Sequence, residues 1–333
     1  MATRKQVAEL AGVSEAVVSY VLHNKPIVKE ATRLKVLEAI QQLGYRPNMM
    51  ARGLKMKQSR QIAVLVGSLG NPFEAGVLLH VEQTAQRHGY AVFFHSYSEQ
   101  SEEELKELLH GRVDGIMLLG QSLREDTIQH FLSTGTPIFS LMAPALHHQD
   151  VGSLDLDWSK AMIKLAAHLK ERGHQRVALM THGSLRHYAS SRANAFQAAA
   201  EAEGLICSDE MTLFGGGTFE HASAAMAEEL KKYDQGAALP YTAIVAVNDL
   251  MALGILSACR KMGVNVPVQL AVAGCEGILM SGETSPPLTT LLYPREELGS
   301  RGTALFIGMI SGDSTIKPPD GELDAELMVR GSV

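Results

Sequence analysis

A short run of polar and aromatic side chains near the N-terminus has the spacing of a recognition surface. Ala16, Ser19, Tyr20 and His23 are spaced so that a helix places them on one face, with Glu15 beside them at the helix start. Carboxylate, hydroxyl and imidazole groups form hydrogen bonds with base edges, and an alanine methyl group contacts the methyl group of thymine. This chemistry is that of reading DNA in the major groove.

The surrounding residues predict two short helices joined by a tight turn. Thr3 and Gln6 have the spacing of a capping box at the start of the first helix, which ends at Gly12. Ser14 is placed to cap a second helix that extends to Leu22. Two short helices that meet at a glycine-containing turn favour a helix-turn-helix, and Ser14 then lies at the DNA-facing end of the second helix.

A third helix is predicted over residues 30 to 43. Leu34, Leu37, Ile40 and Leu43 are expected along one of its sides, where they would complete a three-helix core.

Positive charge is concentrated in this N-terminal region. Residues 1 to 60 contain eleven Lys or Arg and four Glu, a net charge of +7, whereas the remaining residues carry 19 basic and 32 acidic side chains, a net charge of −13. A basic unit on an acidic chain predicts binding to phosphates, and Arg4 is among the side chains expected to contact DNA. An ordinary helical hairpin with a solvated polar face is the alternative.

The whole chain has the composition of a globular protein. Its 333 residues, of which 46% are hydrophobic and 20% charged, leave room for a headpiece and a larger domain. The polar N-terminus and the lack of a long apolar run predict a cytoplasmic protein without a membrane anchor. Cys207, Cys259 and Cys275 are far apart and form no CxxC pair, which predicts reduced thiols.

From residue 61 onward, short apolar runs alternate with helical stretches. Strands are expected at residues 62–67, 91–95, 115–120, 137–142, 176–180, 211–214, 243–248 and 270–275. Helices are expected near residues 73–88, 101–109, 124–134, 158–172, 190–203, 219–233 and 250–262. Two such series predict an α/β fold with two doubly wound parallel sheets.

Polar residues follow several of these predicted strands. Asn71 and Phe73 come after the first strand, Asn248 and Asp249 stand at the end of the apolar run that begins at residue 243, and Glu276 follows the last of the eight strands. Ligands of such sheets bind beyond the carboxyl ends of the strands, so these residues are candidates for a ligand site. For a single Asn or Asp, capping the next helix is the alternative.

Several ordered segments resemble the LacI/GalR family of bacterial transcription regulators. VAELAGVSEAVVSYVL is similar to the headpiece of this family, LGYRPNMMARGL resembles the end of its third helix and its hinge, and IAVLVGSLGNPFEAG resembles the start of its sensor domain. LKERGHQRVAL, AVNDLMALG and SPPLTTLLYPREELG extend the resemblance over nearly the whole chain.

This resemblance implies three regions. They are a helix-turn-helix DNA-binding headpiece at residues 1–46, a hinge helix and linker at 47–60, and an effector-binding and dimerisation domain at 61–333. The last region would be two-lobed, like periplasmic sugar-binding proteins, with residues 288–293 crossing back to the first lobe and a ligand cleft between the lobes.

The resemblance also implies how DNA is bound. A homodimer would read a pseudo-palindromic operator, with the two hinge helices in the minor groove. Leu54 matches the leucine that wedges between base pairs, and Asn48 and Ala51 would flank it. So short a hinge helix is expected to order only on binding.

The recognition helix departs from the family pattern. Tyr20 stands where many members have Arg, Val17 where Thr is usual, and Lys29 where Ser commonly caps the third helix. Residues 14 to 22 contain no Arg, Lys, Gln or Asn, so bidentate readout of guanine or adenine is unavailable. Base reading then falls to the remaining exposed groups, Glu15, Ala16, Tyr20 and His23.

The resemblance further implies an effector site. Asp157 matches an acidic position before the cleft helix, Arg192 an arginine that clamps effector oxygens, and Phe219 an aromatic platform. Asn248 matches a hydroxyl partner, and Glu276 stands where Asp is usual. Carboxylates, amides, a guanidinium and aromatic faces suit a sugar or sugar derivative.

The sequence therefore predicts a dimeric repressor under effector control, with no cofactor and no metal. Inducer and corepressor control fit equally well. A cytoplasmic sugar-binding sensor without gene control and an enzyme on the same scaffold are the alternatives. His147, His148 and Asp150 form a small cluster without metal-ligand spacing and are expected to be a polar loop.

Overall fold

The computed structural model describes residues 2–45, 58–142, 150–183, 191–233, 238–312 and 323–333. The chain separates into two compact units, Met1–Ser59 and Arg60–Val333. Each unit has its own hydrophobic core, so each is described by itself.

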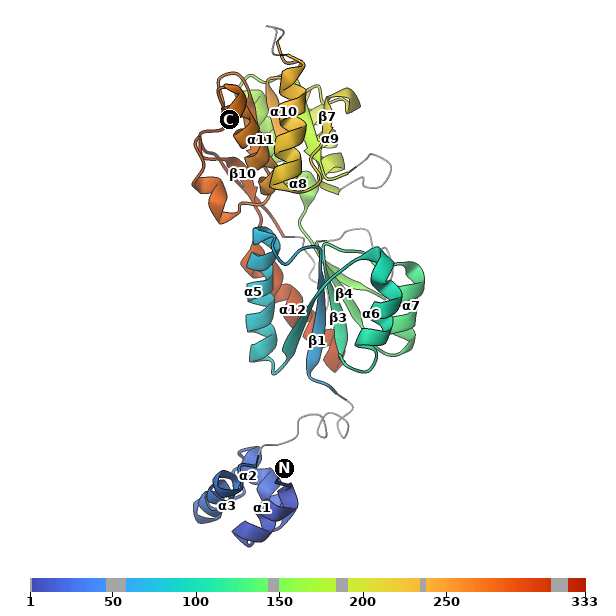
Figure 1. Cartoon of the computed structure of the whole chain (residues 1–333), viewed down its shortest axis with the longest axis vertical. Coiled ribbons are helices and arrows are strands. Elements are labelled where there is room, and N and C mark those ends of the chain that lie inside the picture. Colours follow the sequence, from blue (N-terminus) through green and yellow to red (C-terminus); the bar gives the residue numbers. More distant parts are fainter. Residues whose placement is uncertain (1, 46–57, 143–149, 184–190, 234–237, 313–322) are drawn as a thin grey trace. The chain divides into compact units, whose positions relative to one another are not determined.

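Over residues 2–45, the N-terminal unit contains three helices (Figure 1), which are α1 (Arg4–Ala11), α2 (Glu15–Leu22) and α3 (Glu30–Leu43). All three predicted helices are confirmed. The side chain of Thr3 accepts the backbone N–H of Gln6, and the side chain of Gln6 accepts the backbone N–H of Thr3, which completes the predicted capping box. Gly12 has a φ of 64°, a left-handed conformation that glycine adopts without strain, so the turn after α1 depends on it.

The predicted apolar side of α3 is wrong. Val36 and Ala39 are buried, whereas Leu34 and Leu37 are 52% and 47% exposed. A helix turns by about 100° per residue, so positions 34 and 43 lie on opposite sides and a spacing of three cannot hold one face. Val36 and Ala39 complete the core with Val7, Ala8, Val18, Val21 and Tyr45.

The first lobe of the C-terminal unit is built on a parallel sheet. Its strands are β1 (Gln61–Val66), β2 (Ala91–Ser96), β3 (Gly115–Leu119), β4 (Ile138–Leu141) and β5 (Gly152–Leu154), in the order β2-β1-β3-β4-β5. Ile62 and Val64 belong to the core on one face of the sheet, whereas Ala63 and Leu65 belong to the core on the other. Helices therefore cover both faces, as the continuous apolar runs predicted (Figure 1).

Four helices flank this sheet: α5 (Pro72–Arg87), α6 (Glu102–Leu109), α7 (Glu125–Ser133) and α12 (Arg295–Ser311). Helix α12 was not among the predicted elements. It packs against α5, although it comes from the far end of the sequence. The contact is close, because a side chain at Gly299 would meet the backbone of Val77 at 2.8 Å.

The second lobe has a six-stranded sheet in the order β11-β10-β9-β8-β6-β7. Its strands are β6 (Val177–Thr181), β7 (Thr212–Phe214), β8 (Ala243–Ala246), β9 (Ala271–Gly274), β10 (Thr289–Leu292) and β11 (Glu326–Met328). Its helices are α8 (Trp158–Glu171), α9 (Ser191–Glu203), α10 (Phe219–Lys231) and α11 (Asp249–Met262), and α8 packs on α9 as α10 does on α11. Strand β11 is antiparallel to β10, and the other pairs are parallel.

The expectation that residues 288–293 cross to the first lobe is wrong. Strand β10 belongs to the second sheet, and the chain passes to the first lobe only at Tyr293, just before α12. Another crossing runs from β5 to α8. The C-terminal segment pairs with this crossing, because Leu156 forms a parallel β-bridge with Leu323.

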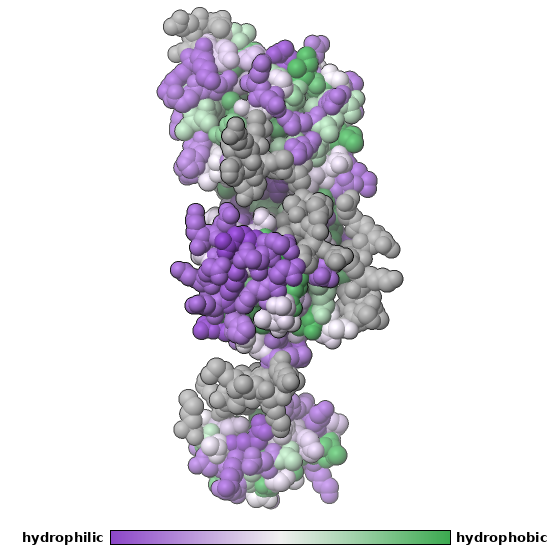
Figure 2. Space-filling view, turned by 90° about the vertical axis from the view of Figure 1, so that its right-hand side faces the viewer, coloured by the Kyte–Doolittle hydropathy of each residue, from purple (hydrophilic) through white to green (hydrophobic). Residues whose placement is uncertain are grey.

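The first lobe presents a broad hydrophilic face (Figure 2). Ion pairs tie α6 to α7 on this lobe: Lys106 bonds Glu103 at 2.9 Å and Asp126 at 2.8 Å, and Arg124 bonds Glu103 at 3.0 Å. The carboxylates of Glu103 and Asp126 are exposed to solvent, so these pairs contribute little stability and mark a solvated surface.

Candidate DNA-binding and effector sites

The predicted reading face of α2 is formed by the structure. Ser14 is the N-cap of this helix and accepts the backbone N–H of Val17 at 3.4 Å. Val18 and Val21 are buried against the other helices, which turns the opposite side of α2 outward. The side chains on that outward side are exposed, except that Ser19 is half-buried: Ser14, Glu15, Ala16, Ser19, Tyr20 and His23.

The orientation of the His23 ring determines which ring nitrogen can form a hydrogen bond with DNA. Its Nδ1 atom lies 2.6 Å from the carbonyl oxygen of Ser19. A carbonyl oxygen only accepts, so Nδ1 carries the hydrogen and the Nε2 atom of a neutral ring is an acceptor. His23 is therefore suited to accept from the amino group of cytosine or adenine.

Two basic side chains of the headpiece, those of Arg33 and Arg4, lie in different surroundings. Arg33 donates to the Asn24 side chain at 2.7 Å and to the carbonyl oxygen of Lys25 at 2.8 Å, so it fixes the turn between α2 and α3. Arg4 is exposed at the start of α1. The three hinge predictions, Asn48, Ala51 and Leu54, lie outside the described residues.

A buried ion pair is the centre of the predicted effector site. The Nη1 atom of Arg192, on α9, lies 2.9 Å from Oε1 of Glu276 and donates to the carbonyl oxygen of Val247 at 2.7 Å. The two side chains are 12% and 5% exposed. Burial raises the pKa of Glu276 to about 7, although the positive charge of Arg192 opposes this change.

Aromatic rings enclose the guanidinium of Arg192. Its central carbon lies 4.5 Å from the ring centre of Trp158 and 5.9 Å from that of Phe73. Tyr293 packs edge-on against Phe73 at 5.2 Å between ring centres and also contacts Trp158 at 5.6 Å. Because Phe73 comes from α5 and Arg192 from α9, the cluster joins the two lobes, and cation–π attraction stabilises it.

A second carboxylate lies at the same junction. The Tyr293 hydroxyl donates to Oδ1 of Asp155 at 2.8 Å, and burial raises the pKa of Asp155. Oδ2 of Asp155 and Oε2 of Glu276 are buried, and the described residues provide neither atom with a hydrogen-bond partner of good geometry. Buried oxygens without partners are costly, so these two atoms favour a ligand that brings hydrogen-bond donors.

Asn248 uses its side chain within the protein. Its oxygen accepts the backbone N–H of Met251 at 2.8 Å and thereby caps α11. Its nitrogen donates to the carbonyl oxygen of Gly217 at 3.0 Å and lies 3.3 Å from Nε2 of His182. In this arrangement Asn248 orients its neighbours, and its two N–H groups are engaged.

Asp249 holds the segment that carries Glu276. Its two carboxylate oxygens accept four hydrogen bonds, from the backbone N–H groups of Glu276 and Ile278 and the hydroxyl groups of Ser281 and Thr290. Asp249 is fully buried. The position of the Glu276 carboxylate therefore depends on a neighbour from α11.

The remaining predicted effector residues begin helices. The Asn71 side chain caps α5 by accepting the backbone N–H of Phe73 at 2.9 Å. Asp157 caps α8 and forms an ion pair with Lys160 at 2.9 Å. Phe219 is the half-buried first residue of α10. The structure thus brings Phe73, Arg192 and Glu276 together, whereas for Asn71 and Asp157 it shows the capping alternative.

Sequence reasoning missed four residues of this cluster: Asp155, Trp158, His182 and Tyr293. His182 directly follows β6, so the rule that pointed to Asn248 and Glu276 could have found it. Asp155, Trp158 and Tyr293 lie where the chain passes between the lobes, and no local pattern marks such positions.

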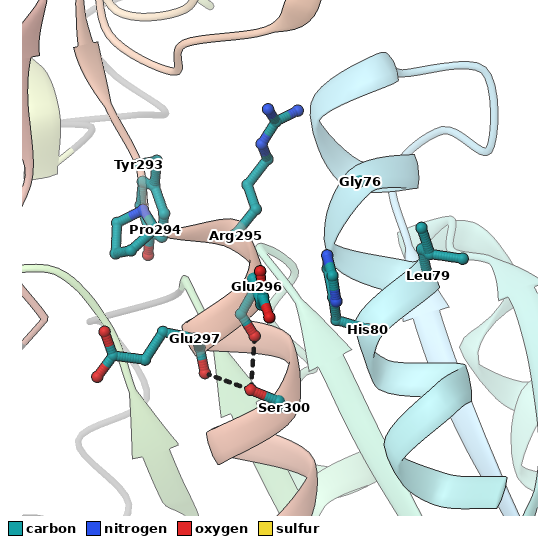
Figure 3. Close-up of a pocket in the computed structure, with 9 residues that line it drawn as sticks. All are labelled: Gly76, Leu79, His80, Tyr293, Pro294, Arg295, Glu296, Glu297 and Ser300. Atoms are coloured by element: carbon teal, nitrogen blue, oxygen red, sulfur yellow. Dashed lines mark hydrogen bonds between the residues drawn. The ribbon is translucent and has the colours of Figure 1, made fainter.

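A cavity of about 700 Å³ lies between α5 and α12 (Figure 3). It is lined by Gly76, Leu79, His80, Tyr293, Pro294, Arg295, Glu296, Glu297 and Ser300. Tyr293 is the one residue that it shares with the aromatic cluster around Arg192. None of the seven predicted effector residues lines it, so it is a separate surface.

Other chemistry receives no support from the described residues. No group of three His, Cys, Asp or Glu there is placed to bind a metal ion, and His147 and His148 lie outside that part of the chain. Cys259 and Cys275 are buried and Cys207 is half-buried, and the structure has all three as free thiols. Within the same residues, no helix is long and apolar enough to cross a membrane.

Comparisons with known proteins agree with this architecture. Residues 3–48 match the model of bacterial regulatory proteins of the lacI family, and residues 166–333 match the periplasmic binding protein-like domain. The chain is 31% identical to the HTH-type transcriptional repressor CytR of Escherichia coli (strain K12) over 99% of this chain and 96% of that protein.

Two solved structures have the same fold. A complex of the transcriptional regulator CelR with cellobiose has a TM-score of 0.73 and 28% identity, with both chains covered completely. The lac repressor dimer bound to operator and the anti-inducer ONPF has a TM-score of 0.81 and 24% identity, with 99% of this chain and 98% of that chain covered.

A helix-turn-helix with an exposed reading face, joined in one chain to a two-lobed sensor fold with a charged aromatic cluster, defines a DNA-binding regulator under effector control. The match to CytR extends over almost the full length of both chains. This chain belongs to the LacI family of bacterial regulatory proteins, and it is a sequence-specific transcriptional regulator.

Proposed function

We propose that this protein is a cytoplasmic repressor whose homodimer binds a pseudo-palindromic operator and whose affinity changes when an uncharged carbohydrate binds around Arg192. The buried Arg192–Glu276 pair, enclosed by aromatic rings and accompanied by two unpartnered carboxylate oxygens, carries this proposal. Repression is the activity named for the relative CytR, and cellobiose is the ligand named for the CelR complex. No catalytic role is proposed.

The charge of the cluster favours an uncharged ligand. The guanidinium of Arg192 is already paired with Glu276, and Asp155 adds a second carboxylate. Among the described residues of the cluster, Arg192 is the cation, and its pairing leaves no free positive charge for a sugar phosphate or sugar acid, whereas hydroxyl groups can donate to Oδ2 of Asp155 and Oε2 of Glu276. Aromatic rings provide faces for the C–H surface of a sugar.

Each proposed role belongs to a separate region of the chain. Residues 1–46 bind DNA through Arg4 and the exposed face of α2, and residues 47–60, which include Asn48, Ala51 and Leu54, form the hinge. Residues 61–333 bind effector and form the dimer. An effector acts through a difference in affinity between two lobe arrangements, of which one favours operator binding.

Selection of bound sequences from a random DNA pool with the full-length protein tests this function. We expect enrichment of a palindrome, with binding that falls steeply as salt rises. The recovered operator then serves in a release assay with D-ribose, cellobiose and cytidine, with glucose 6-phosphate and gluconate as charged controls. A folded dimer that enriches no sequence, alone or with these compounds present, would contradict the proposal.

A further inference from the structure

His182 is oriented by a contact with the side chain of Asn248. Its Nε2 atom lies 3.3 Å from the side-chain nitrogen of Asn248. The orientation of Asn248 is itself fixed, because its oxygen accepts from Met251 and its nitrogen donates to the carbonyl oxygen of Gly217. An amide nitrogen only donates, so Nε2 of His182 is the acceptor and the ring hydrogen of the neutral imidazole lies on Nδ1.

The imidazole lies next to the guanidinium of the effector site. Val247 accepts a hydrogen bond from Arg192, and the following residue, Asn248, holds His182. The end of one strand thus positions both groups. His182 is accessible to solvent, yet burial among surrounding protein atoms and the charge of Arg192 lower its pKa to about 4, so it is neutral at pH 7.

Close packing leaves His182 little freedom. Gly217 has a φ of 75°, and a Cβ atom there would lie 2.5 Å from Cδ2 of the His182 ring. A side chain at position 217 would therefore displace the imidazole. The contact with Asn248 and the close approach of Gly217 thus favour one orientation and one tautomer of the ring before any effector arrives.

We propose that His182 determines effector specificity by donating a hydrogen bond from Nδ1 to an acceptor oxygen of the ligand, beside Arg192. This inference rests on the proposed binding of an uncharged carbohydrate at the Arg192 cluster. His182 and Arg192 recognise ligand oxygens that accept, and Asp155 and Glu276 recognise hydroxyl groups that donate. The site then discriminates between stereoisomers that place these oxygens differently.

The tautomer is tested in the full-length protein by nuclear magnetic resonance of ¹⁵N-labelled histidine, with the His182 signals assigned from the spectrum of His182→Gln. We expect a neutral ring with hydrogen on Nδ1 down to about pH 5. Asn248→Asp keeps an oxygen for the cap of α11 but replaces the donor by an acceptor, so it should move the hydrogen to Nε2 and raise the pKa of His182. A ring that titrates near pH 6.5 with mixed tautomers overturns the inference.

Effector contact is tested by operator release with D-ribose, cellobiose and cytidine. His182→Ala should weaken the response to the active compound about three- to tenfold while leaving operator affinity unchanged. His174→Ala is the matched control, because His174 precedes β6 and also bonds a neighbouring side chain, Thr242, at 2.9 Å. If wild-type protein and His182→Ala respond equally to the same compound, the inference about His182 fails and the proposed carbohydrate function stands. If wild-type protein responds to none of the three compounds, the proposed carbohydrate function fails with it.

Discussion

The reading face of α2 and the Arg192 cluster use polar groups in opposite ways. On α2, the side chains of Glu15 and Tyr20 are exposed to solvent, whereas Val18 and Val21 are the residues of this helix that are buried in the headpiece core. In the sensor unit, Arg192 and Glu276 are buried and paired with each other. The headpiece can therefore meet DNA as it stands, whereas an effector must compete with contacts that already hold the lobes together.

This contrast explains how the sensor unit can regulate the headpiece. A ligand changes a conformational balance only if it binds one arrangement better than the other. The Arg192 cluster takes Phe73 from the first lobe and Glu276 from the second, so a ligand that alters these contacts changes the relation between the lobes. Substitutions in the cluster should alter stability and response together, and substitutions on α2 should alter only recognition.

The largest effect is expected from Asp249→Ala. This change removes the acceptor of four buried hydrogen bonds and should lower the free energy of unfolding of the sensor unit by about 3–5 kcal/mol. Urea unfolding followed by circular dichroism measures it. Asp209→Ala, at an exposed position, should cost less than about 0.5 kcal/mol. A cost below about 1 kcal/mol for Asp249→Ala would show that the segment around Glu276 is held by other contacts.

Arg192→Ala should have the next largest effect, because it leaves Glu276 buried without its partner. We expect a loss of about 3 kcal/mol in the free energy of unfolding and no effector response, with operator binding retained. The double variant Arg192→Met, Glu276→Leu removes both charges and should regain most of the stability without regaining the response. A preserved response in either variant would exclude Arg192 from the effector site.

The sequence predicted the parts that repeat a local pattern. Strands β1–β4 and β6–β9 and the helices between them follow from runs of apolar residues, and the turn at Gly12 follows from its residue type, whereas the short strand β5 was not predicted. Helix α12 was missed because the segment after Tyr293 carries no strong period. The assignment of residues 288–293 failed because pairing with β9 is decided by contacts distant in sequence.

The candidate sites also contain residues that local patterns predict and residues that come together only in the folded chain. Residue spacing placed the outward face of α2 correctly, since helical geometry alone determines it. The resemblance indicated Arg192 and Glu276, but neither spacing nor resemblance indicated Asp155 or Tyr293, which meet through the crossing of two chain segments. Asn248 was expected to face the ligand, whereas in the structure it orients His182.

A pH dependence should distinguish the buried site from the exposed one. The pKa of Glu276 rises from an ordinary value of 4.5 to about 7 on folding, with Arg192, Asp249 and Cys275 as its charged or titratable neighbours. The folded protein then holds a proton that the unfolded chain releases. The resulting stabilisation is complete below pH 4.5 and is lost as the pH rises through about 7, an effect on the order of 3 kcal/mol.

Urea unfolding at pH 5 and pH 8 measures this dependence by comparison of wild type with Glu276→Gln. The difference in stability between the two pH values should be smaller in the variant, because a glutamine does not titrate. Since burial also raises the pKa of Asp155, part of the dependence should remain. An unchanged pH dependence in Glu276→Gln would mean that Glu276 stays ionised beside Arg192.

The smallest expected effect, and the one confined to the headpiece, comes from Tyr20. Its side chain is 44% exposed, so Tyr20→Ala should leave the folding of the three helices unchanged. If Tyr20 contacts a base, the variant should prefer a different half-site, with a change of about 1 kcal/mol at one position of the operator. Tyr20→Phe is the matched control, because it removes only the hydroxyl group and keeps the ring. Competition binding with a pool of half-site variants measures both. Equal weakening on every sequence would instead assign Tyr20 to the DNA backbone, and base reading would then fall to Glu15, Ala16 and His23.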